Sequence, residues 1–162
     1  MLGEIKSEDK RIYLNVKDGA VVRRTATGDQ RFAYVSGAVE KIYTRDRSFR
    51  GETVKYWYID MRDPAGELYS IGFSYRSNVF KGIVLSLATA GTLNDVKIEP
   101  YIKNNYEKVI VYQGGIKLDW IVKSLPPVEV VTVGGREVKD DTKRMNYISS
   151  LVQAINEKAI AG

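Results

Sequence analysis

The stretch KYWYIDMRDPAGELYSIGFSY, residues 55–75, restricts the fold most strongly, because it predicts a β-hairpin in one register. Its centre, Asp63-Pro64-Ala65-Gly66, has the composition of a tight turn. Asp can bond to its own backbone, Pro fixes φ at the second position, and Gly accepts a positive φ. If Gly66 forms a G1-type bulge, Asp63 pairs with Glu67 and the register of the whole hairpin follows.

This register gives the hairpin two faces of different character. One face is almost wholly apolar and is expected to belong to a core. Its cross-strand pairs are Lys55 with Tyr75, Trp57 with Phe73, Ile59 with Ile71 and Met61 with Tyr69. The opposite face pairs Tyr56 with Ser74, Tyr58 with Gly72 and Asp60 with Ser70. A shift of one residue would mix the two faces, so the pattern favours this register and places two tyrosines outside the core.

The composition excludes several kinds of active site. The chain has no cysteine and no histidine, which removes disulfides, thiolate metal sites, cysteine nucleophiles and imidazole acid–base catalysis. The remaining carboxylate, Lys, Tyr and Ser groups form no supporting motif. Asp60, Asp63 and Asp95 could be combined into a metal site on paper, but scattered carboxylates of this kind are expected to be solvated. We therefore predict that the protein is not an enzyme and uses no metal or cofactor.

Charge and tyrosine content point to a class of partner. At 162 residues the chain is long enough for one domain with a sizeable core. It carries 25 basic and 20 acidic residues, a formal charge of +5, and eleven tyrosines. A basic balance favours polyanionic partners. The N-terminus has no apolar signal-like region and no apolar run reaches membrane-spanning length, so we expect a soluble, cytoplasmic protein without a membrane partner.

The first part of the chain is expected to be β-structure. Residues 11–24 predict a hairpin around the two-residue turn Asp18-Gly19, and residues 25–30 predict a loop. Residues 31–45 predict a long strand that bends at Gly37. Residues 46–51 are then expected to form a basic loop that leads into the central hairpin.

After the central hairpin the hydrophobic period changes to that of a helix. Ser77 is a good N-cap, and the apolar stripe that follows predicts a helix over residues 77–90. Strands are expected at 96–102, 108–112 and 116–122, with Trp120 in the core, and a short strand at 128–133. The chain is expected to end in an amphipathic helix with the stripe Met145, Ile148, Leu151, Val152 and Ile155.

This order of elements resembles an OB-fold, the five-stranded Greek-key barrel, here with a helix between its third and fourth strands. VSGAVEKIY resembles the bent first strand, WYIDMRDPAGELYSIGF the second and third strands, SNVFKGIVLSLATAG the helix, and VKIEPYI with KVIVYQ the last two strands. The resemblance covers residues 31–122. The expected fold is all-β with appended helices: an N-terminal hairpin extension in 1–30, an OB-like barrel in 31–124, and a linker, short strand and C-terminal helix in 125–162.

Within that fold the chain is similar to single-stranded DNA-binding proteins of bacteria and phages, which act in DNA replication. The resemblance implies a basic first loop, exposed aromatic residues on strands two and three, and no catalytic residues. The chain departs from the bacterial members at its end. Where they have a flexible acidic tail that recruits other proteins, this chain has an amphipathic helix, which puts the recruiting role in doubt.

The expected binding residues combine flat rings with cations, as a single strand requires. Tyr56 and Tyr58 lie on one face of a strand about 6–7 Å apart, which suits two consecutive bases. The basic loop and the two ends of the central hairpin would supply the phosphate contacts. These residues are Arg45, Arg47, Phe49 and Arg50 in the loop, with Arg62 and Arg76 flanking the hairpin. The plainer alternative is that the tyrosines pack beneath the N-terminal hairpin or the C-terminal helix and that the loop is simply solvated.

Two classes of function remain. The first is non-catalytic, largely sequence-independent binding of single-stranded DNA or RNA. The second is a structural or assembly module whose exposed tyrosines bind protein or sugar. The C-terminal stripe could dock on its own chain, which the sequence favours slightly, or form a homo-oligomer.

Overall fold

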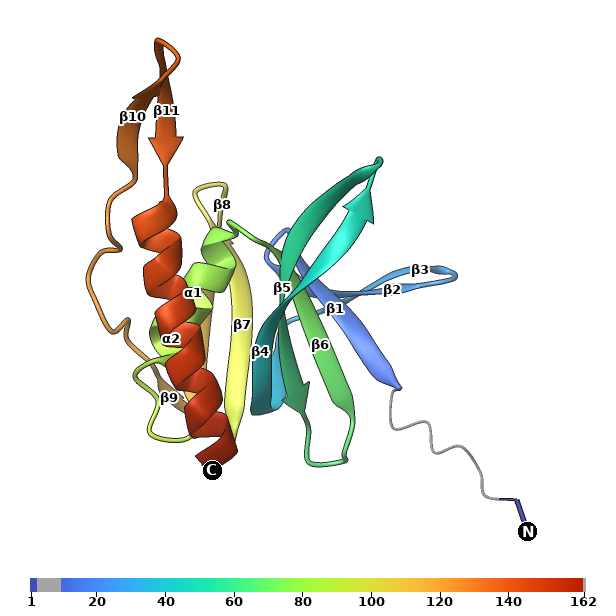
Figure 1. Cartoon of the computed structure of the whole chain (residues 1–162). Coiled ribbons are helices and arrows are strands. Elements are labelled where there is room, and N and C mark those ends of the chain that lie inside the picture. The colour runs from blue at the N-terminus through green and yellow to red at the C-terminus, as the bar shows by residue number, and fades with distance from the viewer. Residues whose placement is uncertain (3–9, 162) are drawn as a thin grey trace.

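The computed structural model describes residues 1–2 and 10–161, so part of the predicted N-terminal extension, residues 3–9, lies outside the described residues. The described chain is mostly β, with two helices (Figure 1). The strands are β1 (Arg11–Lys17), β2 (Ala20–Thr25), β3 (Gly28–Phe32), β4 (Val35–Phe49), β5 (Glu52–Arg62), β6 (Leu68–Ser74), β7 (Val96–Lys103), β8 (Tyr106–Gln113), β9 (Ile116–Lys117), β10 (Glu129–Val133) and β11 (Arg136–Asp140). The helices are α1 (Asn78–Leu87) and α2 (Thr142–Ala161).

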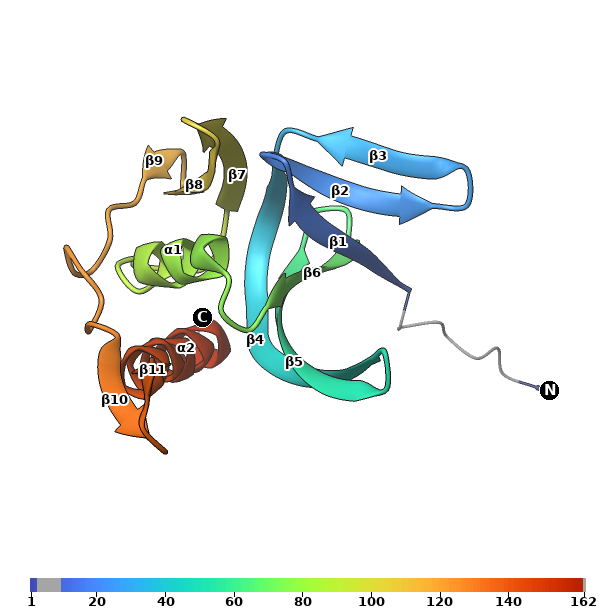
Figure 2. The ribbon, with the colours of Figure 1, turned by 90° about the horizontal axis from the view of Figure 1, so that it is seen from above.

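In the described part of the chain, nine strands form one open mixed sheet in the order β3-β2-β1-β6-β5-β4-β7-β8-β9, and β10 and β11 form a separate two-stranded sheet. The pairings are antiparallel except that of β1 with β6, which is parallel. Within the sheet, β7 returns after α1 to lie beside β4, so the spatial order β7-β4-β5-β6 is that of a Greek key. Both helices lie on the same side of the sheet (Figure 2).

The central hairpin has the register that the sequence predicts. Tyr58 lies opposite Gly72 and Ile59 opposite Ile71. At the turn, Gly66 has a φ of 90°, and the amide of Asp63 donates to the carbonyl of Glu67 over 3.0 Å. The amide of Glu67 in return donates to Oδ1 of Asp63 over 2.9 Å. The bulge therefore fixes which side chains of β5 and β6 enter the core.

Strand β4 bends where the sequence predicts but is longer than predicted. It pairs with β7 as far as Gly37 and with β5 from Ala38 onwards. A Cβ on Gly37 would lie 2.5 Å from the carbonyl oxygen of Arg62, so only glycine allows this change of partner. The predicted loop at 46–51 is wrong: β4 runs on to Phe49, and Arg50-Gly51 form the turn with φ values of 51° and 78°. Two consecutive positive φ angles match the twist of the paired strands, so the ladder continues to the tip.

The prediction of a five-stranded barrel is wrong: the strands form an open sheet, and the N-terminal hairpin occupies the edge that closure would need. The hairpin forms around Asp18-Gly19 as expected, but β1 then pairs along β6. Of the segment predicted as a loop at 25–30, residues 28–30 belong to β3, which pairs with β2, and only residues 26–27 form a turn. The amide of Asp18 donates to a carboxylate oxygen of Glu107 on β8 over 2.7 Å, so the two arms of the curled sheet touch without forming a ladder.

The core lies between the inner face of the sheet and the two helices. As predicted, Ser77 caps α1 by accepting from the amide of Phe80. The ring of Phe80 stacks on Trp57 at 4.8 Å between centroids and contacts Phe73 at 5.6 Å. Helix α2 packs against β4 and α1. Its buried residues are four members of the predicted stripe: Met145, Ile148, Val152 and Ile155.

Two features near the end of the chain differ from expectation. Trp120 is not in the core but 52% exposed, because the predicted strand 116–122 ends at Lys117 and the chain then turns towards α1. The short strand around 128–133 is present as β10, but its partner β11 was not predicted. Neither described helix is both long and apolar enough to cross a membrane.

Asn156 on α2 joins the helix to the sheet. Its Oδ1 accepts from the amide of Ile42 on β4 over 2.8 Å, and its Nδ2 donates to the carbonyl of the same residue over 2.8 Å. This stretch of β4 follows the register shift between Val39 and Lys41. Because β7 pairs with β4 only as far as Gly37, the carboxamide supplies partners to the backbone groups of Ile42 on the edge that β7 no longer covers.

We predict that Asn156→Ala lowers the free energy of unfolding by about 1–3 kcal/mol, because two backbone groups of Ile42 lose their partners. Thermal and chemical denaturation measure the change. Gln153→Ala on the exposed side of α2 is the matched control and should change stability by less than about 0.5 kcal/mol. Equal stabilities for the two variants would contradict this role of Asn156.

Candidate nucleic-acid interface

The sheet face turned away from the helices gathers tyrosines and cations from three strands. On β4 and β5, Tyr43 pairs with Tyr58 and Arg45 with Tyr56, and on β1 Tyr13 pairs with Ser70 of β6. Alternate residues of each strand share a face, so these side chains lie together. We call this surface the tyrosine face; its members are Arg11, Tyr13, Lys41, Tyr43, Arg45, Arg47, Tyr56, Tyr58 and Asp60. In Figure 2 it lies between the β2–β3 and β4–β5 hairpins.

Tyr58 is the centre of this face but is not exposed. Its ring stacks on Tyr43, with centroids 5.8 Å apart and planes at 22°, and Tyr13 meets it edge-on at 6.5 Å. Gly72 makes room for it, since a Cβ there would lie 3.1 Å from Cε1 of Tyr58. The side chain is 7% exposed, so the prediction of an open Tyr58 ring is wrong, whereas Tyr13 is 52% exposed.

Tyr56 is half-buried, and a guanidinium covers part of its ring. The Arg47 guanidinium carbon lies 5.0 Å from the ring centroid, and Arg45 lies directly across the ladder. Beside them is a hollow of about 440 Å³, lined by Arg11, Tyr13, Lys41, Tyr43, Arg45 and Asp60. Two of the predicted cations therefore lie beside the predicted ring, together with Lys41, Tyr43 and Tyr13, which the sequence did not single out.

The carboxylate of Asp60 is neutralised within the face. It is 5% exposed and accepts from Arg11 over 2.8 Å, from Tyr43 over 3.0 Å and from Ser70 over 2.6 Å. Burial alone would lower the pKa of Arg11, but the attraction of Asp60 and Tyr43 holds it above its usual value. Burial raises the pKa of Tyr43. The ring of Tyr43 is thus held in place, and the positive charge of Lys41, Arg45 and Arg47 is left in excess.

The remaining predicted site residues lie at the margins or elsewhere. Phe49 is 58% exposed at the tip of the β4–β5 hairpin, with the Arg50 guanidinium 5.2 Å from its ring. Arg62 is held by Glu40 at 2.9 Å. Arg76 is held by Asp141, next to α2, at 2.6 Å, away from the tyrosine face.

Tyr13 could not have been predicted as a member of the tyrosine face from residues 11–17 alone. It reaches the face because β1 pairs in parallel with β6. A signal for the other residues was present in the sequence. Alternate positions of one strand share a face, and these positions carry Lys41, Tyr43, Arg45 and Arg47.

No protein-family profile, curated protein or solved structure matches the chain. The geometry of the site is therefore the only basis for a functional assignment.

Tyr58→Ala should lower the free energy of unfolding by about 3–5 kcal/mol, as for other buried aromatic rings, because the space between Tyr13, Tyr43 and Gly72 would be left empty. Tyr56→Ala, at a half-buried position of the same strand, should cost about 1 kcal/mol or less. Urea denaturation of both variants measures the difference. A small effect at Tyr58 would show that its ring is not a structural part of the face.

Proposed function

We propose that this protein binds single-stranded nucleic acid without catalysis and largely without regard to sequence, through the tyrosine face. The observation that supports it most is the combination on one sheet face of accessible tyrosine rings with cations that form no ion pair with any carboxylate in the described part of the chain. Arg11 offsets Asp60, and Lys41, Arg45 and Arg47 remain beside Tyr13 and Tyr56.

The chemistry of a single strand fits this surface. Its phosphates need cations along a path, and its bases need flat rings, to which every base can stack regardless of identity. Tyr13 and Tyr43 provide rings at the hollow, and Tyr56, which pairs with Arg45, lies further along β5 on the same face. The β4–β5 hairpin extends the path to Phe49 and Arg50 at its tip.

We also propose that β4 to β8 with α1 form an OB-like unit whose closing position is occupied by β1 and β2. The Greek-key order of β7-β4-β5-β6, the bend of β4 at Gly37 and the position of α1 between β6 and β7 support this interpretation. In such a unit the β4–β5 hairpin corresponds to the first loop beside the binding cleft.

One feature favours the second function, a structural module that binds protein. The β10–β11 hairpin projects beyond the body (Figure 1), and Val130, Val133 and Val138 on it are 62%, 61% and 45% exposed. The buried stripe of α2 docks on its own chain, and homo-oligomer formation through that helix stays a prediction. Salt distinguishes the two functions, because phosphate contacts weaken steeply with added salt and apolar contacts do not.

Replacing Arg45, Arg47 and Arg50 with alanine should weaken binding of a labelled dT oligonucleotide and reduce the salt slope by about 0.7 for each phosphate that the protein no longer neutralises. Fluorescence anisotropy at several salt concentrations measures both quantities. Arg76→Ala is the control, because Arg76 is paired with Asp141 away from the face, and its slope should equal that of the unaltered protein. An unchanged slope in the triple variant would place the phosphate path elsewhere.

Tyr13→Ala and Tyr56→Ala should each cost roughly 1–3 kcal/mol of oligonucleotide binding while the salt slope stays the same, because stacking involves the ring and no ion release. Phenylalanine at either position should restore most of the affinity. Tyr106→Ala, on a 70% exposed ring of β8, is the control and should bind normally. If neither tyrosine matters while the arginine variant still binds more weakly, the contact is electrostatic and the rings are not stacking surfaces.

A further inference from the structure

One edge of β8 is only partly paired. β7 pairs with β8 along its full length, but on the other edge β9 pairs only with Tyr112 and Gln113. The last bond on that edge runs from the amide of Leu118 to the carbonyl of Val111, over 2.8 Å. Residues 106–110 therefore have no strand partner on this side among the residues that the structure describes. Because alternate residues direct their backbone groups to the same edge, Val109 and Glu107 present theirs to it.

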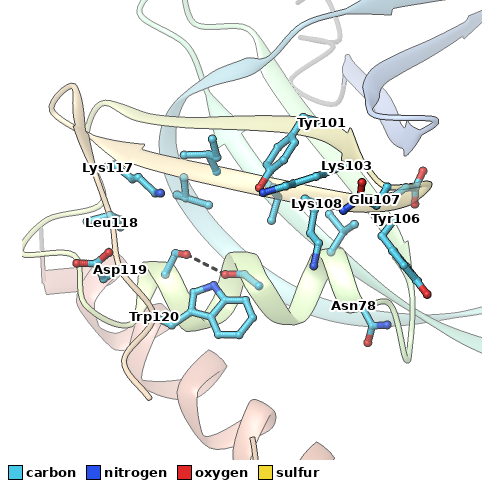
Figure 3. Close-up of a pocket in the computed structure, with 17 residues that line it drawn as sticks. Asn78, Tyr101, Lys103, Tyr106, Glu107, Lys108, Lys117, Leu118, Asp119 and Trp120 are labelled. Atoms are coloured by element: carbon cyan, nitrogen blue, oxygen red, sulfur yellow. Dashed lines mark hydrogen bonds between the residues drawn. The ribbon is translucent and has the colours of Figure 1, made fainter. Parts of the chain in front are cut away.

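A groove runs beside this free edge. After Leu118 the chain crosses to α1, where the amide of Ile121 donates to the carbonyl of Leu85 over 3.0 Å. A hollow of about 660 Å³ remains between α1, the crossing segment and β8 (Figure 3). Gly82 lets Val109 and Trp120 pack closely against α1, since a Cβ there would lie 3.2 Å from Cγ1 of Val109 and 3.7 Å from Cζ2 of Trp120.

Trp120 gives this groove an apolar wall. Its side chain lies beside α1 (Figure 3), and it is 52% exposed. Exposing so much of the largest apolar side chain is costly, and an inserted side chain would bury it. The wall and the free backbone groups of β8 together provide a side-chain pocket next to a strand edge.

The rim of the groove is positively charged. Lys103, Lys108 and Lys117 line it, and none of them forms an ion pair within the described part of the chain. The lining carboxylates are those of Glu107 and Asp119, so three lysines face two carboxylates and the rim keeps a net positive charge. The rim therefore complements a segment that carries negative charge.

We propose that the free edge of β8 receives an extended, acidic peptide segment of a partner protein as an added strand, with one apolar or aromatic side chain against the exposed side of Trp120. Backbone pairing would supply affinity, the groove would select the inserted side chain, and the lysines would select the flanking acidic residues. An extended peptide can pair its own N–H and C=O groups with the row of unpaired backbone groups on β8. A nucleic acid has no such row of peptide groups and cannot form this ladder. The inference does not depend on the proposed function, because this groove lies off the tyrosine face.

The probe is a labelled peptide of about eight residues, composed of Asp and Glu around one Phe, enough to span an edge about 16 Å long. Anisotropy titration of the whole protein should show saturable binding. The same peptide with Pro at alternate positions, which removes backbone donors, should bind at least about tenfold more weakly. Lys103→Glu with Lys108→Glu should weaken the first peptide by about tenfold or more, and Trp120→Ala should do the same.

Lys139→Glu on β11, an exposed lysine away from the groove, is the matched control and should bind the peptide normally. Melting temperatures establish that each variant is folded, and the two-lysine variant tests the proposal by itself if Trp120→Ala is unstable. The proposal is overturned if the peptide does not bind, or if the Pro-containing peptide binds equally well. It is also overturned if these variants lose dT oligonucleotide and not peptide, which would make the groove part of a nucleic-acid path.

Discussion

The turn at residues 63–67 holds β5 and β6 in one register, and both sides of the sheet depend on that register. Two hydrogen bonds between Asp63 and Glu67, with Gly66 at a positive φ, prevent a slip of one residue. The core side can then bury Ile59 and Ile71 completely, under helix α1. The opposite side is left with Tyr56, Tyr58 and Asp60, which are poor core residues and become the basis of the tyrosine face.

The parallel pairing of β1 with β6 turns that second side into a specific surface. It brings Arg11 to the carboxylate of Asp60, which would otherwise be a costly buried charge. It also brings Tyr13 against Tyr58 in an edge-on contact. Tyr58 is thereby buried, and Tyr13 is the exposed ring at this position. The same pairing occupies the edge of β6 and keeps the sheet open. The β1–β6 pairing therefore accounts for the open sheet, for the neutralisation of Asp60 by Arg11 and for the exposed ring of Tyr13.

The two proposed surfaces rely on different physical properties. On the tyrosine face the backbone groups are paired in a continuous sheet, so recognition falls to side-chain rings and charges. Along β8 the ladder ends at Val111, so backbone groups themselves remain available next to Trp120. A protein that holds a nucleic acid on one surface and an acidic strand on another could link the two, and each surface can be altered without touching the other.

The sequence by itself determined the elements whose signals are local. The bulge at Gly66, the bend at Gly37, the cap at Ser77 and the buried stripe of α2 follow from turn chemistry, capping and periodicity within a few residues. For the site, it determined that Arg45, Arg47 and Tyr56 would lie away from the core. These features could be read because each depends on neighbours along the chain.

The tertiary structure decided what depends on contacts between distant segments. Whether β6 pairs with β1 or with β8 cannot be read from either strand, because both have the alternation of an ordinary sheet strand. That choice placed Tyr13 and Arg11 on the face, covered Tyr58 and left the sheet open. The exposure of Trp120 likewise depends on where the chain leaves β8. Its alternation with Ile116 and Leu118 would suit a core strand equally well. Local patterns specify which face a side chain takes, and only the long-range pairing specifies what lies across from it.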